Sequence, residues 1–381
     1  MKKCLLVVAL AAFSLSIGAQ TQQVKMYNRL NGGYVIVNAE GDILGFSDKG
    51  SAKNLSAEMS DIFQDMGMSV QATSEPLPAS VEAFLSEDVT DSIAPLLGDI
   101  EFAQSAPYNN LAPTGQGGQR CMAGCVAIAM AQIMAYYQYP EEGCKGTIEY
   151  KTSTLSKTIK VNMEGETFDW ENILPTYKNG YDATQAAAVA KLVYYCGASA
   201  YMDYGVGASG TNSSKVPNAF YANFDYDENV QHLTKGESGY TDAQWNELIQ
   251  SELKGAFPVY MSSQQKSGSG HAYVCDGYKI LKGFEKYPYY HINWGWDGSC
   301  NGWFMLNSLK ITSENPEDFT DLSYNLAIIY NIRPKGYTPV EDVHVETTST
   351  DAIYDILGNR VTEMRAGNIY IVNGKKVIVK Q

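Results

Sequence analysis

Residues 120–137 read RCMAGCVAIAMAQIMAYY, and from Val126 onward Gln132 is the only strongly polar residue in twelve. Apolar residues occupy every side of the implied helix, so the pattern predicts a helix buried all round rather than an amphipathic surface helix. Gly124 permits a tight turn into this helix. Cys125 would then lie among free amide N–H groups at the positive end of the helix dipole, where we expect a lowered thiol pKa and a nucleophilic thiolate. Free cysteine is also a common core residue, so the pattern alone leaves that interpretation open.

The chain has 381 residues, which is long enough for two or three domains with a sizeable core. Its formal net charge is −14 and its sequence pI is about 4.8. A surface this acidic repels phosphate backbones and anionic lipids, which argues against nucleic acid and membrane surfaces as partners. Beyond the first residues, no apolar run is long enough to predict a membrane span.

The chain begins with features of a bacterial export signal. Residues 1–19 combine a short basic start, an apolar run from Leu5 to Ile17 and a small residue at Ala19, where we expect cleavage. Six cysteines follow, which are too few for a disulfide scaffold of this size and lack the paired CxxC spacing of zinc sites. We therefore expect a catalytic thiol, and we expect neither a metal nor an organic cofactor.

Four regions are predicted along the chain. Residues 1–19 are the signal, 20–95 a small α+β unit with a linker, 96–335 the main domain and 336–381 a small β tail. Within 20–95, residues 33–37 and 43–46 resemble a hairpin, and a helix is expected near Ser56 to Met66.

The main domain is predicted to place helices first and an antiparallel sheet afterwards, which is an α+β arrangement. Beyond the central helix, residues 183–196 and 242–255 read as helices, with a hairpin within 147–170. The strands expected in the second half cover residues 258–261, 271–278, 289–294, 303–306 and 326–332.

His271 follows a glycine-bearing loop and begins one of these strands, 146 residues after Cys125. This separation lies within the interval of about 130 to 150 residues typical of papain-like cysteine proteases. Such chemistry needs a thiolate, a neighbouring imidazole, an amide that orients the ring and donors for the oxyanion. Cys125, His271, Asn293 and Gln104 can fill these places in that order.

Alternatives remain open at several of these positions. His291 is a rival base and Cys121 a rival nucleophile, while Asn293 is also a common turn residue. Trp294, Trp296 and Trp303 all read as possible core aromatics, and this interpretation is favoured for Trp296 and Trp303. His232 and His344 read as surface residues. The loop around Tyr204, Gly205 and Ser209 reads as a substrate pocket or as an ordinary surface loop.

Several ordered blocks resemble the streptopain family of bacterial papain-clan cysteine proteases: PYNNLAP, GCVAIAMAQIMAYYQYP, YMDYG before a Ser/Gly loop, GHAYVCDGY and YHINWGWDGSCNGWF. The resemblance covers most of residues 96–332. It implies a papain-like fold with Cys125 as nucleophile and His271 as general base. It further implies Gln104 in the oxyanion hole, with Asn293 and Trp294 positioning and shielding the histidine.

The N-terminal unit, with GGYVIVNAEGDILGFSDKG, resembles the family's inhibitory propeptide but is shorter, and Ala123 stands where the family commonly has Thr. The resemblance therefore implies a secreted cysteine endopeptidase made as a zymogen, with protein or peptide substrates and its own propeptide as intramolecular inhibitor. Two other functions fit the same residues less fully. A cell-wall peptide amidase would use the same Cys-His chemistry, and a catalytically silent inhibitor or adhesin would keep only the fold.

Overall fold

The structure is a computed structural model, and it describes residues 22–29, 32–39, 41–49, 60, 68–264, 270–282, 287–306, 326–337, 353–355, 360–361, 364, 369–372 and 375–378. The predicted export signal at 1–19, the linker at 339–351 and His344 lie outside the described residues. So do most of the helix expected near Ser56 to Met66 and the middle of the loop before His271.

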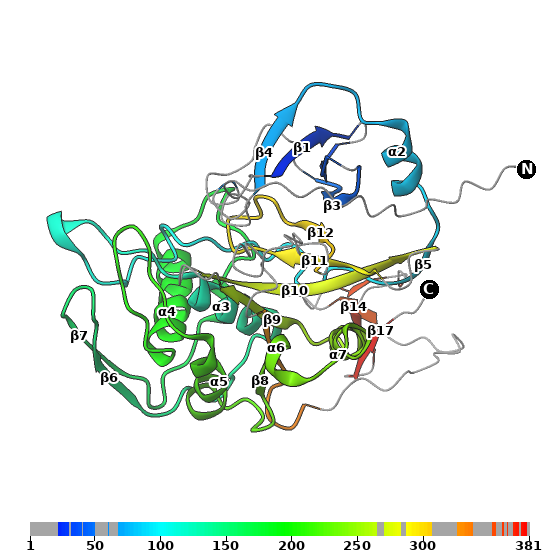
Figure 1. Cartoon of the computed structure of the whole chain (residues 1–381). Coiled ribbons are helices and arrows are strands. Elements are labelled where there is room, and N and C mark those ends of the chain that lie inside the picture. Colours follow the sequence, from blue (N-terminus) through cyan, green and yellow to red (C-terminus); the bar gives the residue numbers. More distant parts are fainter. Residues whose placement is uncertain are drawn as a thin grey trace, which may run out of the picture.

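An eleven-stranded sheet forms the centre of the molecule (Figure 1). Its order is β4-β1-β2-β3-β12-β11-β10-β9-β13-β8, and β5 pairs with the far part of β10. Its strands are β1 (Gln22–Asn28), β2 (Tyr34–Val37), β3 (Ile43–Ser47), β4 (Met68–Thr73), β5 (Val89–Ile93), β8 (Gln231–Thr234), β9 (Val259–Gln264), β10 (Gly270–Leu281), β11 (Tyr289–Asn293), β12 (Gly302–Phe304) and β13 (Ala327–Tyr330).

Every pair in this sheet is antiparallel except β1 with β4. The predicted α+β class and the five predicted strands of the second half are confirmed, with ends shifted by a few residues. Two smaller sheets are separate from the main sheet. One is the hairpin of β6 (Thr147–Lys151) and β7 (Thr158–Asn162). The other contains β14 (Ile353–Asp355), β15 (Arg360–Val361), β16 (Ile369–Val372) and β17 (Lys375–Ile378).

The N-terminal strands extend the main sheet. The predicted hairpin forms as β2 and β3, flanked by β1 and β4. β3 joins β12 through Phe46 opposite Trp303 and Gly45 opposite Phe304. A Cβ on Gly45 would lie 2.4 Å from the Phe304 ring, which explains why a glycine stands at this close approach. The proposed division at residue 95 stays a prediction, since the sheet is continuous on either side of it.

The helices of the described residues are α2 (Ala79–Leu85), α3 (Cys125–Tyr137), α4 (Ala183–Ser199), α5 (Val216–Phe224), α6 (Lys235–Ser238) and α7 (Asp242–Lys254), with short 3-10 turns at Gln116–Gly118, Trp170–Asn172 and Ser213–Lys215. The prediction that the second helix ends at Cys196 is wrong, because the helix continues through Gly197 to Ser199. A Cβ at Gly197 would lie 2.5 Å from the Tyr204 hydroxyl, so this glycine serves close packing rather than termination.

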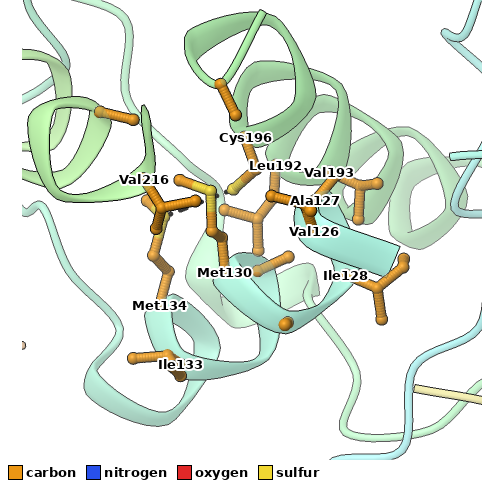
Figure 2. Packing of buried hydrophobic residues seen from close by; sticks show 14 of the residues in the cluster. Val126, Ala127, Ile128, Met130, Ile133, Met134, Leu192, Val193, Cys196 and Val216 are labelled. Carbon is orange, nitrogen blue, oxygen red and sulfur yellow. Dashed lines mark hydrogen bonds between the residues drawn. The ribbon is translucent and has the colours of Figure 1, made fainter. Parts of the chain in front are cut away.

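Helix α3 is buried all round, as the sequence predicts: Val126 through Met134 are all buried. It packs beside α4, and Figure 2 shows Met130 and Met134 directed toward Leu192 and Cys196, with Val216 of α5 closing the cluster. Burial of each such side chain contributes about 1.5–3 kcal/mol. Helix α3 is therefore held firmly in place by its surroundings.

Successive residues of β10 enter different cores. Ala272 and Val274 pack with α3 and α4, whereas Tyr273 and Cys275 pack with α7 and the N-terminal strands. This alternation confirms the faces expected from the sequence. Strand β10 is thus covered on both sides, and its first residues lie where α3 meets the sheet (Figure 1). None of the helices in the described part of the chain combines the length and apolarity required to span a bilayer.

Candidate active site

Cys125 is the first residue of α3 and is partly exposed, unlike the nine residues that follow it. Three backbone N–H groups lie at its sulfur, those of Cys125, Val126 and Ala272. The first two belong to the start of the helix, whose N–H groups have no partner within the helix. The third comes from β10 and immediately follows His271. The sulfur thus lies beside the strand that carries the predicted base.

Gly124 makes this approach possible. Its φ is +91°, a backbone conformation that side-chain-bearing residues rarely adopt. The space where a Cβ would point is occupied by Met202 and by the carbonyl oxygen of Ser209. Ser209 in turn donates its hydroxyl to the Met122 carbonyl at 2.7 Å. The loop that follows Tyr204 therefore packs directly against the residues that lead into Cys125.

His271 is the second residue of β10, and its Nε2 lies 2.9 Å from the backbone carbonyl oxygen of Trp294. A carbonyl oxygen can only accept, so Nε2 carries a hydrogen and donates it. In the neutral ring this leaves Nδ1 as the basic nitrogen. The structure therefore fixes the tautomer that a general base needs.

Asn293 does not orient the ring in the way that the sequence suggests. Its side-chain Nδ2 donates to the Ile100 carbonyl at 2.7 Å, and its Oδ1 accepts from the Gly295 N–H at 3.1 Å. In this structure the backbone carbonyl of the next residue, Trp294, makes the hydrogen bond to the ring. Asn293 is 2% exposed and instead holds the segment that leads to Gln104.

The aromatic ring nearest the imidazole belongs to Trp296. Its ring centroid lies 4.5 Å from that of His271 with an interplanar angle of 24°, whereas Trp294 lies at 6.2 Å. Trp294 stacks on Trp296 and is 3% exposed. The sequence assigned the shield to Trp294 and read Trp296 only as a core aromatic. Trp296 is buried but contacts the imidazole face, and its place two residues after Trp294 is the one sequence signal for this role.

Gln104 is tied through its backbone to the residues that precede Cys125. Its carbonyl oxygen accepts the N–H of Ala123 at 3.0 Å, two residues before Cys125. Its side chain is partly exposed. The five predicted site residues therefore come from four places: the segment before α3, the start of α3, the start of β10 and the end of β11.

The electrostatics of the pair differ from the expectation of a stabilised thiolate. Burial raises the pKa of the Cys125 thiol above its ordinary value, more strongly than the three N–H groups lower it. Burial also lowers the pKa of His271 to about 4, against a smaller opposing effect of the Trp294 carbonyl. The lowered thiol pKa predicted from the sequence is wrong for this structure, because desolvation of the thiol outweighs the effect of the backbone N–H groups. Both shifts favour a neutral thiol and a neutral imidazole.

The rival residues lie elsewhere. His291 Nδ1 is 2.6 Å from a carboxylate oxygen of Asp276, which is 1% exposed and also accepts the Leu97 N–H. Cys121 is fully buried, and burial raises the pKa of its thiol. His232 lies half-buried on β8 rather than on the surface. Among the described residues, no group of three His, Cys, Asp or Glu side chains is arranged to hold a metal ion.

The model of the peptidase C10 family matches residues 102–304, which is more than half of the 381-residue chain. The chain belongs to the peptidase C10 family. Streptopain from Streptococcus pyogenes serotype M1 is 33% identical over 308 residues, covering 75% of this chain and 74% of streptopain. The thiol protease/hemagglutinin PrtT of Porphyromonas gingivalis is 30% identical over 294 residues, which span 73% of this chain and 33% of PrtT.

Two solved structures have a similar fold. A fragment of prointerpain A from Prevotella intermedia aligns over 82% of this chain and 99% of its own, with a TM-score of 0.60 and 23% identity. Active interpain A from the same organism aligns over 68% of this chain and 100% of its own, with a TM-score of 0.53 and 27% identity. Family membership makes this chain a cysteine peptidase, which confirms the predicted class of enzyme and the streptopain resemblance.

Proposed function

We propose that this cysteine peptidase is a secreted endopeptidase that uses Cys125 as nucleophile and His271 as general acid and base. The observation that carries the proposal is the Ala272 N–H at the Cys125 sulfur, since it brings the start of α3 to the residue after His271. The fixed tautomer of His271 supports the same assignment. Asn293 and Trp294 position the His271 ring through the turn after β11: Asn293 holds this turn by its hydrogen bonds, and the Trp294 carbonyl accepts from the ring.

The reaction follows from these groups. His271 Nδ1 takes the proton of the Cys125 thiol, and the sulfur attacks the carbonyl carbon of the scissile peptide bond. The tetrahedral intermediate collapses as the imidazolium gives its proton to the leaving amine, which departs and leaves a thioester on Cys125. Water, deprotonated by the neutral imidazole, then attacks the thioester carbonyl and releases the carboxylic acid and the thiol. No cofactor takes part in these steps.

The negative charge on the attacked oxygen needs hydrogen-bond donors. The Cys125 backbone N–H at the start of α3 supplies one, and the side-chain amide of Gln104 supplies the second. The bond from Ala123 to the Gln104 carbonyl supports this role, because it ties Gln104 to the residues that lead into the nucleophile. The loop around Ser209 contacts the same residues through its bond to the Met122 carbonyl, and we assign it to the peptide substrate.

Residues 20–95 are the inhibitory propeptide and its linker in this proposal. Tyr34 of β2 donates its hydroxyl to the Cys300 carbonyl at 2.7 Å within the protein interior. Cys300 lies in the turn between β11 and β12 that also carries Trp294 and Trp296. Apolar residues of the N-terminal strands share one core with both tryptophans: Val24, Met26, Ile36 and Leu44. The N-terminal unit thus packs against the turn whose Trp296 ring stacks on His271.

This packing gives a physical reason for latency. With the N-terminal unit in place, burial holds the pKa of Cys125 up and that of His271 down, so the reactive thiolate–imidazolium pair is rare. Release of the unit would let water reach the turn, which favours the ion pair. The largely exposed passage at residues 74–80 offers a cleavage position. The backbone N–H groups of Leu96 and Leu97 donate hydrogen bonds to Asp276, so these residues stay with the catalytic part.

Export rests on residues 1–19, and residues 336–381 form an accessory β tail. The proposal is tested by producing the full chain and its Cys125→Ala and His271→Ala variants, with casein and peptidoglycan as substrates. We expect the wild-type chain to degrade casein and to lose its N-terminal unit, and both variants to remain full-length and inactive. N-terminal sequencing then locates both cuts. Casein hydrolysis by Cys125→Ala, or peptidoglycan hydrolysis alone by the wild type, would contradict the proposal.

A further inference from the structure

Gln132 is a buried polar residue that the mechanism above does not use. It is 0% exposed and is the one strongly polar side chain among the nine buried residues of α3. It follows Cys125 by seven residues, which is two helical turns, so both side chains lie on the same face of the helix. That face meets the turn after β11: a Cβ at Gly295 would lie 2.8 Å from Ile128 and 4.0 Å from Gln132 Nε2.

The Gln132 side chain makes one specific bond. Its Oε1 accepts the backbone N–H of Phe102 at 3.1 Å in the protein interior. Its Nε2 is buried and has no hydrogen-bond partner among the described residues. Burying an amide donor without a partner costs about 1–3 kcal/mol. An apolar side chain of the same size would avoid that cost, so the bond to Phe102 is the physical reason for an amide at this position.

Phe102 belongs to the segment that ends at Gln104, and this segment is held at several points. Asn293 Nδ2 donates to the Ile100 carbonyl at 2.7 Å. The Asp297 N–H donates to the Phe102 carbonyl at 2.9 Å, and the Ala123 N–H to the Gln104 carbonyl at 3.0 Å. The first two bonds tie the segment to the turn after β11. Gln132 ties it to the helix that carries the nucleophile.

We propose that Gln132 is a positioning residue for the oxyanion hole. It fixes the Phe102 N–H against α3 and so sets where the Gln104 side chain stands relative to the Cys125 sulfur and N–H. The proposal rests on the oxyanion role of Gln104 given above. In this role Gln132 affects the stabilisation of the tetrahedral intermediate. A residue that only packed the helix start would instead affect the reactivity of the Cys125 thiol.

Two reactions of the same sulfur separate these roles. Peptide hydrolysis builds an oxyanion, whereas alkylation by iodoacetamide displaces iodide and builds none. Gln132→Met removes the acceptor and nearly keeps the side-chain length. We expect it to lower kcat for a peptide amide by about 10- to 100-fold, below the loss of about 10²–10³ seen when an oxyanion donor is removed outright. KM and the alkylation rate should stay within about threefold, because thiol and substrate contacts remain.

Gln104→Ala should show the same split, and the double variant should lose no more kcat than Gln104→Ala alone, since both changes act on one group. Asn223→Leu is the matched control. Asn223 is also a buried side-chain amide, and its Nδ2 donates to the Lys145 carbonyl at 3.1 Å. We expect its kcat to be unchanged. Every variant is produced as the full chain and processed by the same treatment with wild-type enzyme.

The proposal is overturned if Gln132→Met keeps kcat within twofold, if its alkylation rate falls in proportion to kcat, or if the losses in the double variant multiply. A full kcat in Gln104→Ala would instead show that the oxyanion assignment itself is wrong. If Gln132→Met does not fold, Gln132→Leu is the second variant. Failure of both to fold would assign the amide to the fold and would also overturn the proposal.

Discussion

Gly124→Ala tests whether the turn before Cys125 is as tightly determined as the contacts indicate. At φ +91° and ψ 135° an alanine is strained, which costs about 1–3 kcal/mol. Its Cβ would lie 2.7 Å from Met202 Sδ and Cε and 3.1 Å from the Ser209 carbonyl oxygen. Overpacking of this kind adds about 1–3 kcal/mol. We therefore expect a loss of about 2–6 kcal/mol in the free energy of unfolding, measured by urea denaturation.

The same change should impair catalysis, since relief of the clash displaces Cys125 from the Ala272 N–H. A displacement of about 1 Å costs on the order of 100-fold in rate. Gly118→Ala is the control: its φ is +76°, but nothing lies within 4 Å of the added Cβ. It should lose about 1–2 kcal/mol and keep full activity. If Gly124→Ala were as stable and as active as Gly118→Ala, the reasoning about this turn would be refuted.

Three further predictions follow from the site. Trp296→Leu removes the ring stacked on His271 and should move its pKa up from about 4 toward the ordinary value, seen as a higher titration midpoint by NMR. Because the folded-state pKa of His271 is lowered, its contribution to stability is complete above about pH 6.5 and is lost as pH falls toward about 4. Trp296→Leu should weaken this pH dependence of the free energy of unfolding, measured by urea denaturation. An unchanged pH dependence would contradict burial by Trp296 as the cause. His291→Ala should cost about 2–4 kcal/mol in the free energy of unfolding, because it removes a partner of buried Asp276, yet should leave kcat nearly intact; a large loss of kcat at full stability would make His291 the base. Tyr34→Phe loses the bond to Cys300 and should speed release of the N-terminal unit, measured by the time course of processing; unchanged processing would argue against the latency contact.

The sequence predicts the parts of the site that depend on local pattern. An apolar run with a glycine and a cysteine at its start specifies a buried helix and its first residue, because burial on every side tolerates little else. The alternation in β10 likewise places Tyr273 and Cys275 on one face. His271 could be found because a loop leads into this strand.

The remaining features depend on the backbone of turns and on packing between distant segments. The partner of the His271 ring is the Trp294 carbonyl, and no side-chain pattern reveals where a carbonyl points. The stacking of Trp296 depends on the path of the turn after β11. Burial of the thiol reverses the pKa shift that the helix terminus alone would give. The Gln132 bond to Phe102 joins residues 30 apart and required the fold.

The central claim is that one sulfur and one imidazole carry the proteolysis. The most direct measurement treats the processed enzyme with a labelled peptidyl electrophile and maps the label by mass spectrometry across the six cysteines of the described chain. We predict label on Cys125 alone, with peptide hydrolysis lost in proportion to labelling and labelling slowed strongly by His271→Ala. Label on another cysteine, or hydrolysis that continues after Cys125 is fully labelled, would contradict the account.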